Sequence, residues 1–425
     1  MDTEITISPR EVRRSFLLGV FNGAAFEFAE RLIDPPLVLT WFISRLTSSN
    51  LLIGLVTPLG DAGWFLPQIF ISPLVQRMGR KMPSYTAAAV ARAASWLLLA
   101  AAVWLVSRPG LLLAAFFVLY SVARLAAGLA GLAFFDVVAK TIPARRRGSF
   151  FAWRLLFGGL LGIVAGWIVS MLLDAPGFTF PRSYALLFLL YCAAAVPAMA
   201  AFIAIREPPG KTVGERVTLG QQLRRAGYLL RHDAVFRRYM ATRLALALAG
   251  IAVPFYAVYA RQVLGAPEGM VGVYLMTRIG AQLLFNLPWG RLSDRCGNRL
   301  TMLLSTLGSG LTALVALALV VASVLFRPQG AWLPYLAIPV FLLDGAVRPS
   351  LVLVDSNFLL ELVPGAERPL YLGLSNTLIG IAVLLSGMGG VVVDLCGFAG
   401  LFLLAAGLCL LAHLWARGLP EPRRS

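Results

Sequence analysis

The chain has 425 residues, of which 59% are apolar and only 13% are charged. A soluble domain averages about 45 to 50% apolar residues, so the composition excludes an ordinary water-soluble enzyme. The chain carries 37 basic and 20 acidic residues, which gives a net charge of +17. Such a surplus is typical either of nucleic-acid binding or of basic loops between membrane spans, and its distribution decides between them.

Apolar segments long enough to cross a bilayer, about 20 residues each, recur along the whole chain. In the first half they lie at residues 13–33, 50–74, 84–106, 110–139, 149–172 and 183–205. In the second half they lie at residues 237–262, 267–291, 299–325, 332–362, 369–394 and 397–417. We therefore expect an all-α membrane protein with twelve transmembrane helices in two sets of six.

A long polar segment, residues 206–233, separates the two sets, and its later part could form a short amphipathic surface helix. We predict an N-terminal six-helix bundle over residues 1–205, a linker over residues 206–236 and a C-terminal six-helix bundle over residues 237–425. The first apolar run has acids before it and no small-residue cleavage site after it, so we expect it to remain as a span.

The basic residues cluster in alternate loops, as expected when Lys and Arg are retained on the cytoplasmic side. With the N-terminus inside, the outer loops hold only Arg45, Arg108, Arg182, Arg261 and Arg327. We expect both termini and the linker to be cytoplasmic, and the protein to lie in a prokaryotic plasma membrane. The positive charge is then a topology signal, and no nucleic-acid partner is expected.

The two halves resemble each other in sequence. Gln76–Lys81 aligns with Asp294–Arg299 at an offset of 218 residues (295 − 77), and Thr141–Phe150 aligns with Leu362–Tyr371 at an offset of 221 (364 − 143). Two matches in the same order at nearly the same offset indicate duplication of a six-helix unit. Repeats of this kind place a substrate site near the middle of the membrane, between the halves.

The loop after the eighth span carries a motif with fixed spacing. Gly290, Asp294, Arg295, Gly297 and Arg299 fit the pattern G-x-x-x-D-R-x-G-x-R. With this loop, the chain resembles the major facilitator superfamily of secondary transporters over nearly its whole length. The resemblance implies two pseudo-symmetric six-helix bundles that rock around a central cavity.

The matching loop after the second span departs from this pattern, because Ser72 and Gln76 replace the glycine and the aspartate. It retains Arg77, Gly79, Arg80 and Lys81. A partial match to the superfamily's motif in the fourth span, R-x-x-Q-G, occurs at Arg124 and Gly128, with Ala127 in place of the glutamine.

By resemblance, these two loops are gates. An aspartate at a helix end can accept hydrogen bonds from a neighbouring helix N-terminus and from arginines, and rocking of the bundles would break those bonds. We expect Asp294 and Arg295 to hold one access state, whereas Gln76 provides no ionic component in the first loop. The first glycine is expected to allow a close helix crossing and the second a tight reversal. The alternative is that both loops only fix the topology.

Charged side chains deep inside spans are candidate functional residues, because each costs at least about 2.5 kcal/mol at the centre of a membrane. The deep ones are Glu27, Asp61, Arg92, Arg124, Arg154, Arg243, Arg278, Asp344, Arg348 and Asp355. In the superfamily, the first, fourth, seventh and tenth spans line the cavity. The resemblance therefore selects Glu27, Arg124, Arg243, Asp344, Arg348 and Asp355.

Three of these charges share one stripe of the tenth span. Asp344 and Arg348 are four residues apart and Asp355 follows seven residues later, so all three lie on one helix face. This spacing predicts a wet wall whose charges respond to substrate or proton. The alternative is a structural pair in which Asp344 and Arg348 neutralise each other.

Arg124 has no acid within one turn of its own helix, so it needs an anionic partner from another span or from substrate. We expect that partner to be Glu27 or Asp61, each of which is also a candidate proton site. Arg278 has no charged counterpart in the first half, which makes it a further candidate for substrate contact. Each of these residues has a purely structural alternative, an ion pair between helices.

Other chemistries find no signal in the sequence. Cys192, Cys296, Cys396 and Cys409 have no metal or redox spacing, and neither His232 nor His413 lies in a ligand pattern. We expect no cofactor, no metal and no enzymatic activity. The fifth span contains Gly158, Gly159, Gly162 and Gly166 but lacks the proline of the superfamily's drug antiporters, which argues against drug export.

The sequence thus predicts a monomeric secondary transporter in the lipid bilayer, which moves a small solute by alternating access and is coupled to a proton or solute gradient. The many deep arginines favour an anionic or amphiphilic solute. The alternatives are a non-transporting scaffold or assembly factor on the same fold, or a flippase for a lipid-like molecule.

Overall fold

A computed structural model describes residues 8–76, 78–209, 229, 231–326, 329–363 and 368–421, and within these ranges it leaves out the side chains of 65–76, 355, 356, 360 and 368–370. Several predictions fall outside it: those on Arg77, Arg327, the side chains of Ser72, Gln76 and Asp355, and most of the linker. The described residues form helices and connecting turns, without a strand. The all-α fold class is confirmed.

A helix lies at each of the predicted spans. The first six are α1 (Pro9–Leu32), α3 (Asn50–Gln76), α4 (Met82–Leu105), α5 (Pro109–Thr141), α6 (Ala144–Leu173) and α7 (Arg182–Ile203). The others are α9 (Ala234–Ala249) with α10 (Val253–Gln262), α11 (Met270–Cys296), α12 (Asn298–Phe326), α13 (Ile338–Leu362), α14 (Arg368–Ser386) and α15 (Gly389–Arg417).

Nine helical segments of the described chain are long and apolar enough to cross a membrane. Many of them expose large apolar side chains, for example Leu105, Leu284 and Phe326. Exposing such apolar surfaces to water is unfavourable, whereas the hydrocarbon interior of a membrane accommodates them. The protein is therefore a multi-pass membrane protein.

Two boundaries differ from the sequence prediction. The eleventh span ends at Ser386 and α15 begins at Gly389, several residues before the predicted break at 394–397. Glycines at 387, 389 and 390 favour a turn there, because glycine is a poor helix former. The predicted position coincides instead with Gly397, whose φ of 68° marks a kink inside α15. In the seventh span, a short 3-10 segment, η2 (Gly250–Ala252), separates α9 from α10.

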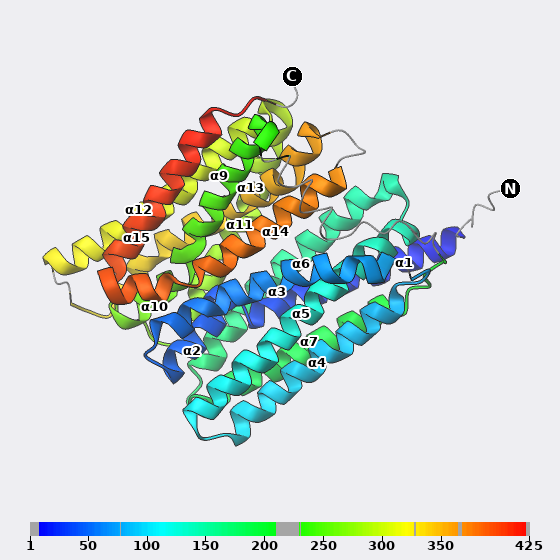
Figure 1. The fold of residues 1–425 in the computed structure, drawn as a ribbon. Helices are drawn as coiled ribbons and strands as arrows, with labels where there is room; N and C mark the ends of the chain where they lie inside the picture. Colours follow the sequence, from blue (N-terminus) through cyan, green and yellow to red (C-terminus); the bar gives the residue numbers. More distant parts are fainter. Residues whose placement is uncertain are drawn as a thin grey trace. The chain divides into compact units, whose positions relative to one another are not determined.

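The described helices divide into two compact units, which we consider one at a time (Figure 1). The first unit comprises Met1–Asp34 and Gly63–Arg216, and the second comprises Pro35–Ala62 and Val217–Ser425. The second unit thus includes a short π-helical segment, η1 (Pro35–Leu39), the helix α2 (Thr40–Leu46) and the first half of α3. Of these segments, η1 and α2 pack against α10.

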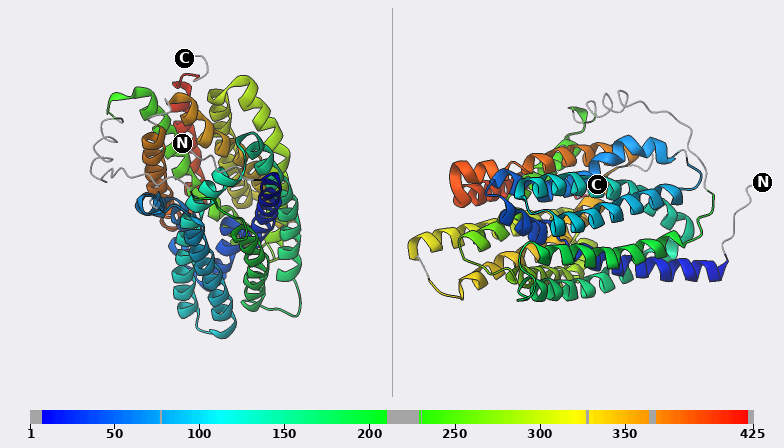
Figure 2. Two further views of the ribbon diagram at one scale, coloured as in Figure 1. Left: turned by 90° about the vertical axis from the view of Figure 1, so that its right-hand side faces the viewer. Right: turned by 90° about the horizontal axis from the view of Figure 1, so that it is seen from below.

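Both units repeat one packing pattern. In the first unit, α1 lies beside α6 and α7, and α4 lies beside α5 and α7 (Figures 1 and 2). In the second, α9 lies beside α14 and α15, and α12 lies beside α13 and α15. In these four pairs of helices, each contact in the first unit has a counterpart about 220 residues later in the second. This agrees with the internal duplication predicted from the two loop motifs.

Aromatic side chains fill the centre of the first unit. Trp96 of α4 lies 6.1 Å from the ring of Tyr120, 5.2 Å from Phe188 and 5.1 Å from Tyr191, measured between ring centroids. All four side chains are buried. This packing fixes α4, α5 and α7 relative to one another, and so fixes the charged side chains on them.

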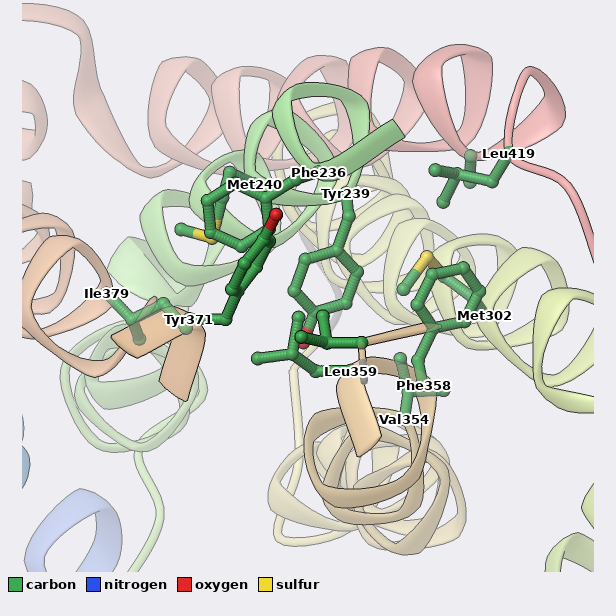
Figure 3. Close-up of a cluster of buried hydrophobic side chains, with 12 residues drawn as sticks. Phe236, Tyr239, Met240, Met302, Val354, Phe358, Leu359, Tyr371, Ile379 and Leu419 are labelled. Carbon is green, nitrogen blue, oxygen red and sulfur yellow. The ribbon is translucent and has the colours of Figure 1, made fainter. Parts of the chain in front are cut away.

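A second aromatic cluster joins α9, α13 and α14 in the second unit (Figure 3). Tyr239 stacks on Phe358 at 5.2 Å, and Phe236 meets Tyr371 edge-on at 4.7 Å. The hydroxyl of Tyr371 donates to Asp233 at 3.0 Å, and the other carboxylate oxygen of Asp233 accepts the backbone N–H of Phe236 at 2.8 Å. One acid therefore caps α9 and ties it to α14.

Candidate functional site

A three-residue charge cluster spans α1, α4 and α5 of the first unit. Glu30 accepts from Arg92 at 2.5 Å and from Arg124 at 3.1 Å, one arginine on each carboxylate oxygen. Arg92 also donates to the hydroxyl of Tyr191 at 2.7 Å and lies 4.7 Å from the ring of Phe26. The acid thus holds α4 and α5 through the buried Arg92 and the partly buried Arg124.

The partner of Arg124 is therefore Glu30, not Glu27 or Asp61 as we expected from the sequence. Glu27 points along its own helix and pairs with Arg31 at 3.4 Å, where 40% of its side chain is exposed. Arg31 also approaches Asp34 at 3.6 Å. One helical turn separates Glu27 from Glu30, and the packing of α4 and α5 in the first unit selects the latter.

Asp61 lies near the middle of α3, as the twelfth of its 27 residues, and is half-buried. Within the described part of the chain it makes no hydrogen bond and no ion pair. A charged group at this depth is costly unless it meets water, a partner or a ligand. Asp61 therefore differs from Glu27, the other predicted proton site, which has Arg31 beside it.

In the second unit, Arg278 of α11 pairs with Asp344 of α13 at 2.7 Å. Arg278 is only 4% exposed. The two helices touch at Gly345, where a Cβ would overlap the backbone carbonyl of Arg278. This glycine permits the close approach that brings the two charges together.

The ion pair of Asp344 therefore joins two helices, and it is not the pair with Arg348 that spacing along α13 had predicted as the structural alternative. Arg348 lies one turn further on and is exposed. In the seventh span, Arg243 is buried and donates to Tyr239 at 3.5 Å. Arg348 and Arg243 therefore occupy different environments: the first is exposed and the second is buried.

Polar contacts also hold residues 35–62 within the second unit. Arg261 donates to the backbone carbonyl of Ser44 at 2.5 Å and to its hydroxyl at 2.7 Å. Arg45 pairs with Glu268, and Asn50 donates to Asp394 at 2.6 Å. Arg45 and Arg261, which we assigned to outer loops as topology markers, therefore also bind neighbouring segments of the second unit.

Glycines bring the backbones in this region close together. A Cβ at Gly54 would lie 3.1 Å from the carbonyl of Gly387 and from the amide of Gly390. A Cβ at Gly390 would overlap the backbone of Asn50. The small residues that end the eleventh span and begin α15 therefore form a close-packing surface.

The second candidate gating loop, Gly290–Arg299, adopts the predicted tight reversal. Gly297 has a φ of 88°, and a Cβ there would overlap the carboxylate of Glu421. That carboxylate accepts the backbone N–H groups of Asn298 at 3.3 Å and Arg299 at 3.0 Å, so it caps α12. Asp294 and Arg295, the predicted latch, lie exposed in the last turn of α11.

Gly290 stands apart from Gly297, because no described atom lies within 4 Å of a Cβ built at Gly290. Replacing Gly297 with alanine is expected to lower the free energy of unfolding by about 1 to 3 kcal/mol, the cost of this backbone conformation for a residue other than glycine. The matched Gly290→Ala variant should be neutral or slightly stabilising. Thermal unfolding of both purified variants checks this, and equal losses at the two positions would contradict it.

The first candidate gating loop, residues 76–81, is also closed by a capping acid. Glu207, which follows α7, accepts the backbone N–H groups of Lys81 and Met82 at 2.7 Å, and so caps α4. The amines of Lys81 and Lys140 both approach Asp136, at 3.2 and 2.6 Å, and Lys140 also bonds Glu207 at 2.7 Å. Arg80 is exposed.

Sequence reasoning missed both capping acids. A signal was present, because a Glu-Pro pair follows the last span of each half, at Glu207 and Glu421, 214 residues apart (421 − 207). Glu30 was also not among the candidate residues, although it is the acid that binds Arg124. Arg92 and Arg154 were recognised as deep charges but not selected.

The C-terminal half of the chain matches a known family in sequence. Residues 239–425 match the Major Facilitator Superfamily. The predicted resemblance is therefore confirmed over this part of the chain, which includes the loop Gly290–Arg299 that suggested it. A comparison with curated proteins gave no sequence match.

Solved structures with the same fold match nearly the whole chain. A D-xylose–proton symporter has a TM-score of 0.73 at 15% identity, with 97% of this chain and 99% of that chain covered. A mutant form of the nucleoside transporter NupG has a TM-score of 0.70 at 16% identity, with 95% and 98% covered. The xylose transporter XylE from E. coli, in a partially occluded inward-open conformation, has a TM-score of 0.68 at 14% identity, with 97% and 98% covered.

Proposed function

We propose that this chain, which has the major facilitator fold and the superfamily's sequence in residues 239–425, is a secondary transporter that moves a small solute across a membrane by alternating access. Two halves of six spans each, as the sequence predicts, are the parts that such a cycle requires. Transport, not catalysis, is the role of the described neighbours, which are a nucleoside transporter and a sugar–proton symporter.

The observation that carries the proposal is the set of ion pairs inside the spans. Glu30 with Arg92 and Arg124 in the first unit, and Arg278 with Asp344 in the second, place charge where a lipid-facing helix would have apolar residues. Buried pairs contribute little net stability compared with apolar packing. A polar path for a solute therefore explains these ion pairs better than a purely structural role in a scaffold.

The residues proposed to contact substrate or proton are those that the sequence suggested. They are Glu27, Asp61, Arg124, Arg278, Asp344, Arg348 and Asp355. Glu30 joins this set, because it is the acid bound to Arg124. The gating role falls to the loops around Gly79 and Gly297, with Asp294 and Arg295 as the latch of the second loop.

Asp61 is the preferred coupling site. A carboxylate that no cation of the described chain neutralises can take up a proton or cation in one access state and release it in the other. Glu27 is the weaker candidate, since Arg31 lies 3.4 Å away from it.

We also propose a monomer with both termini and the linker in the cytoplasm.

Transport by proteoliposomes tests the function. Vesicles with purified protein would be given a panel of radiolabelled metabolites, first in solute exchange without a gradient and then with an imposed pH gradient. We expect at least one solute to exchange in wild type and to accumulate with the gradient. Protein-free vesicles set the background, and exchange of no solute above that background would argue against a transporter.

The same assay tests the coupling site. Asp61→Asn is expected to keep exchange but to lose accumulation by at least about tenfold, because the coupling group is gone while the solute path remains. Asp174→Asn is the matched control, because Asp174 is exposed at the C-terminal end of α6 and outside the proposed solute path, and this variant should retain accumulation. Accumulation by Asp61→Asn at the wild-type level would remove Asp61 from the mechanism.

A further inference from the structure

Arg154 lies on α6 of the first unit and is held there by contacts with several other residues. It is the eleventh of the 30 residues of α6, about 15 Å from the start of that helix. Its side chain lies against Gly23 of α1, where a Cβ would come within 2.6 Å of Cγ, Nε and Cζ of the arginine. Any larger residue at position 23 would push the guanidinium away.

Neutral groups hold the guanidinium in this notch. Nη1 donates to the backbone carbonyl of Gly19 and, at 3.0 Å, to the side-chain oxygen of Asn22. Asn22 is itself fixed, because its amide donates to the carbonyl of Ala198 at 2.8 Å. The cation also lies 4.7 Å from the ring of Phe134 and 5.3 Å from that of Phe150. These contacts set its orientation.

The charge of Arg154 is not balanced by a paired acid. In the described part of the first unit, Glu30 pairs with Arg92 and Arg124, and Glu27 and Asp34 pair with Arg31. No carboxylate described there lies within 4 Å of Arg154, and Glu27 acts on it only at longer range. The direct partners of Arg154 are a carbonyl, an amide and two aromatic rings, so its positive charge remains available at mid-span.

The unused edge of the guanidinium has the shape of an anion site. Nε and Nη2 make no hydrogen bond to the described residues. Neither belongs to the fully buried polar atoms of the described chain that lack a hydrogen-bond partner. Two adjacent N–H groups on a rigid plane match the two oxygens of a carboxylate or phosphate in a bidentate contact. Nη1 fixes the plane and leaves this edge available.

We infer that Arg154 anchors an anionic group of the transported solute, a carboxylate or a phosphate, through its Nε and Nη2 edge. This inference rests on the proposed transport function and assigns the substrate class. It also adds a residue that the family resemblance did not select, since only the first, fourth, seventh and tenth spans were expected to line the cavity.

Ligand-induced stabilisation of the purified full chain provides the test. The probes are charged molecules and neutral analogues of similar size: lactate against lactamide, succinate against succinamide, and glucose 6-phosphate and inorganic phosphate against glucose and glycerol. We expect at least one anion to raise the unfolding temperature in a saturable way while its neutral analogue does not. The carboxylate and phosphate arms separate the two kinds of anion.

Three variants identify the site. Arg154→Gln should lose the stabilisation by that anion at least tenfold in affinity, and Arg154→Lys should retain part of it, because a lysine keeps the charge without the fork. Gly23→Ala keeps the arginine but displaces it, and should weaken binding as well. Arg182→Gln is the control, since Arg182 also lies over an aromatic ring, 5.6 Å from Trp104, at the start of α7. It should bind the anion as wild type does.

Three results would overturn the inference: neutral analogues that stabilise as strongly as anions, anion binding that is unchanged in Arg154→Gln and Gly23→Ala, or no stabilisation of wild type by any anion. If Arg154→Gln fails to fold, Arg154→Lys and Gly23→Ala still decide the outcome. The transport proposal fails separately. An anion that binds at Arg154 but never crosses proteoliposomes would refute transport alone, and transport of neutral solutes alone would refute only the anion class.

Discussion

Replacing Glu30 with alanine is expected to lower the free energy of unfolding by about 3 to 5 kcal/mol, the usual cost of removing one partner of a buried ion pair. Glu30 is the acid for both Arg92 and Arg124, and only 22% of its side chain is exposed. Its loss would remove the carboxylate that these two cations share. Unfolding of the purified protein in detergent, followed by circular dichroism, measures the change.

Glu27→Ala is the matched control for this experiment. Glu27 lies on the same helix, but 40% of its side chain is exposed and its pair with Arg31 joins neighbours within α1. Exposed pairs of this kind contribute about 0 to 1 kcal/mol. A Glu30→Ala variant as stable as Glu27→Ala would show that the charge cluster does not hold the first unit together.

The second large effect is expected at Asp344. Asp344→Ala leaves Arg278 buried without its carboxylate, and should also cost about 3 to 5 kcal/mol. Replacing both partners, with Asp344→Leu and Arg278→Met together, removes both charges, and should recover most of the stability. Thermal unfolding of the single and double variants in the same detergent gives this comparison.

Transport by the double variant then separates structure from function. If the pair lies on the solute path, the double variant should be folded but at least about tenfold less active in solute exchange. A double variant that folds and exchanges solute at the wild-type rate would make the pair a purely structural link between α11 and α13.

The fold could be predicted because its signals are local in sequence. Apolar length predicted a helix at each span, and the spacing of Gly290, Asp294 and Gly297 gave the family resemblance and the tight turn. The duplication followed from two short alignments. Where the boundaries differed, the cause was glycine: Gly389 begins a helix that we expected to begin near Gly397.

The partners of the charged residues could not be predicted in the same way, because they depend on the rotation and register of one helix against another. Spacing along α13 suggested that Asp344 neighbours Arg348, but the close approach at Gly345 brings Arg278 to Asp344. Arg124 likewise pairs with Glu30, one turn from the expected Glu27. The depth of these charges was readable from the sequence, whereas their contacts required coordinates.

The two capping acids could have been found in the sequence, but not from its composition or its hydrophobic periodicity. Glu207 and Glu421 each lie outside the apolar spans, yet both bind the first backbone N–H groups of a helix that begins over a hundred residues earlier in the chain. A search for pairs repeated at the offset of the duplication, rather than for charge within spans, would have found them.

Alternating access is the central claim, and a distance measurement between the two halves tests it most directly. Spin labels would be placed at Arg80→Cys and at the exposed native Cys296, in the two gating loops, with the other cysteines replaced by alanine. Pulsed electron resonance in proteoliposomes should give two distances, with populations that shift when an exchanged solute is added. A single distance, unchanged by that solute in protein that still exchanges it, would contradict the account.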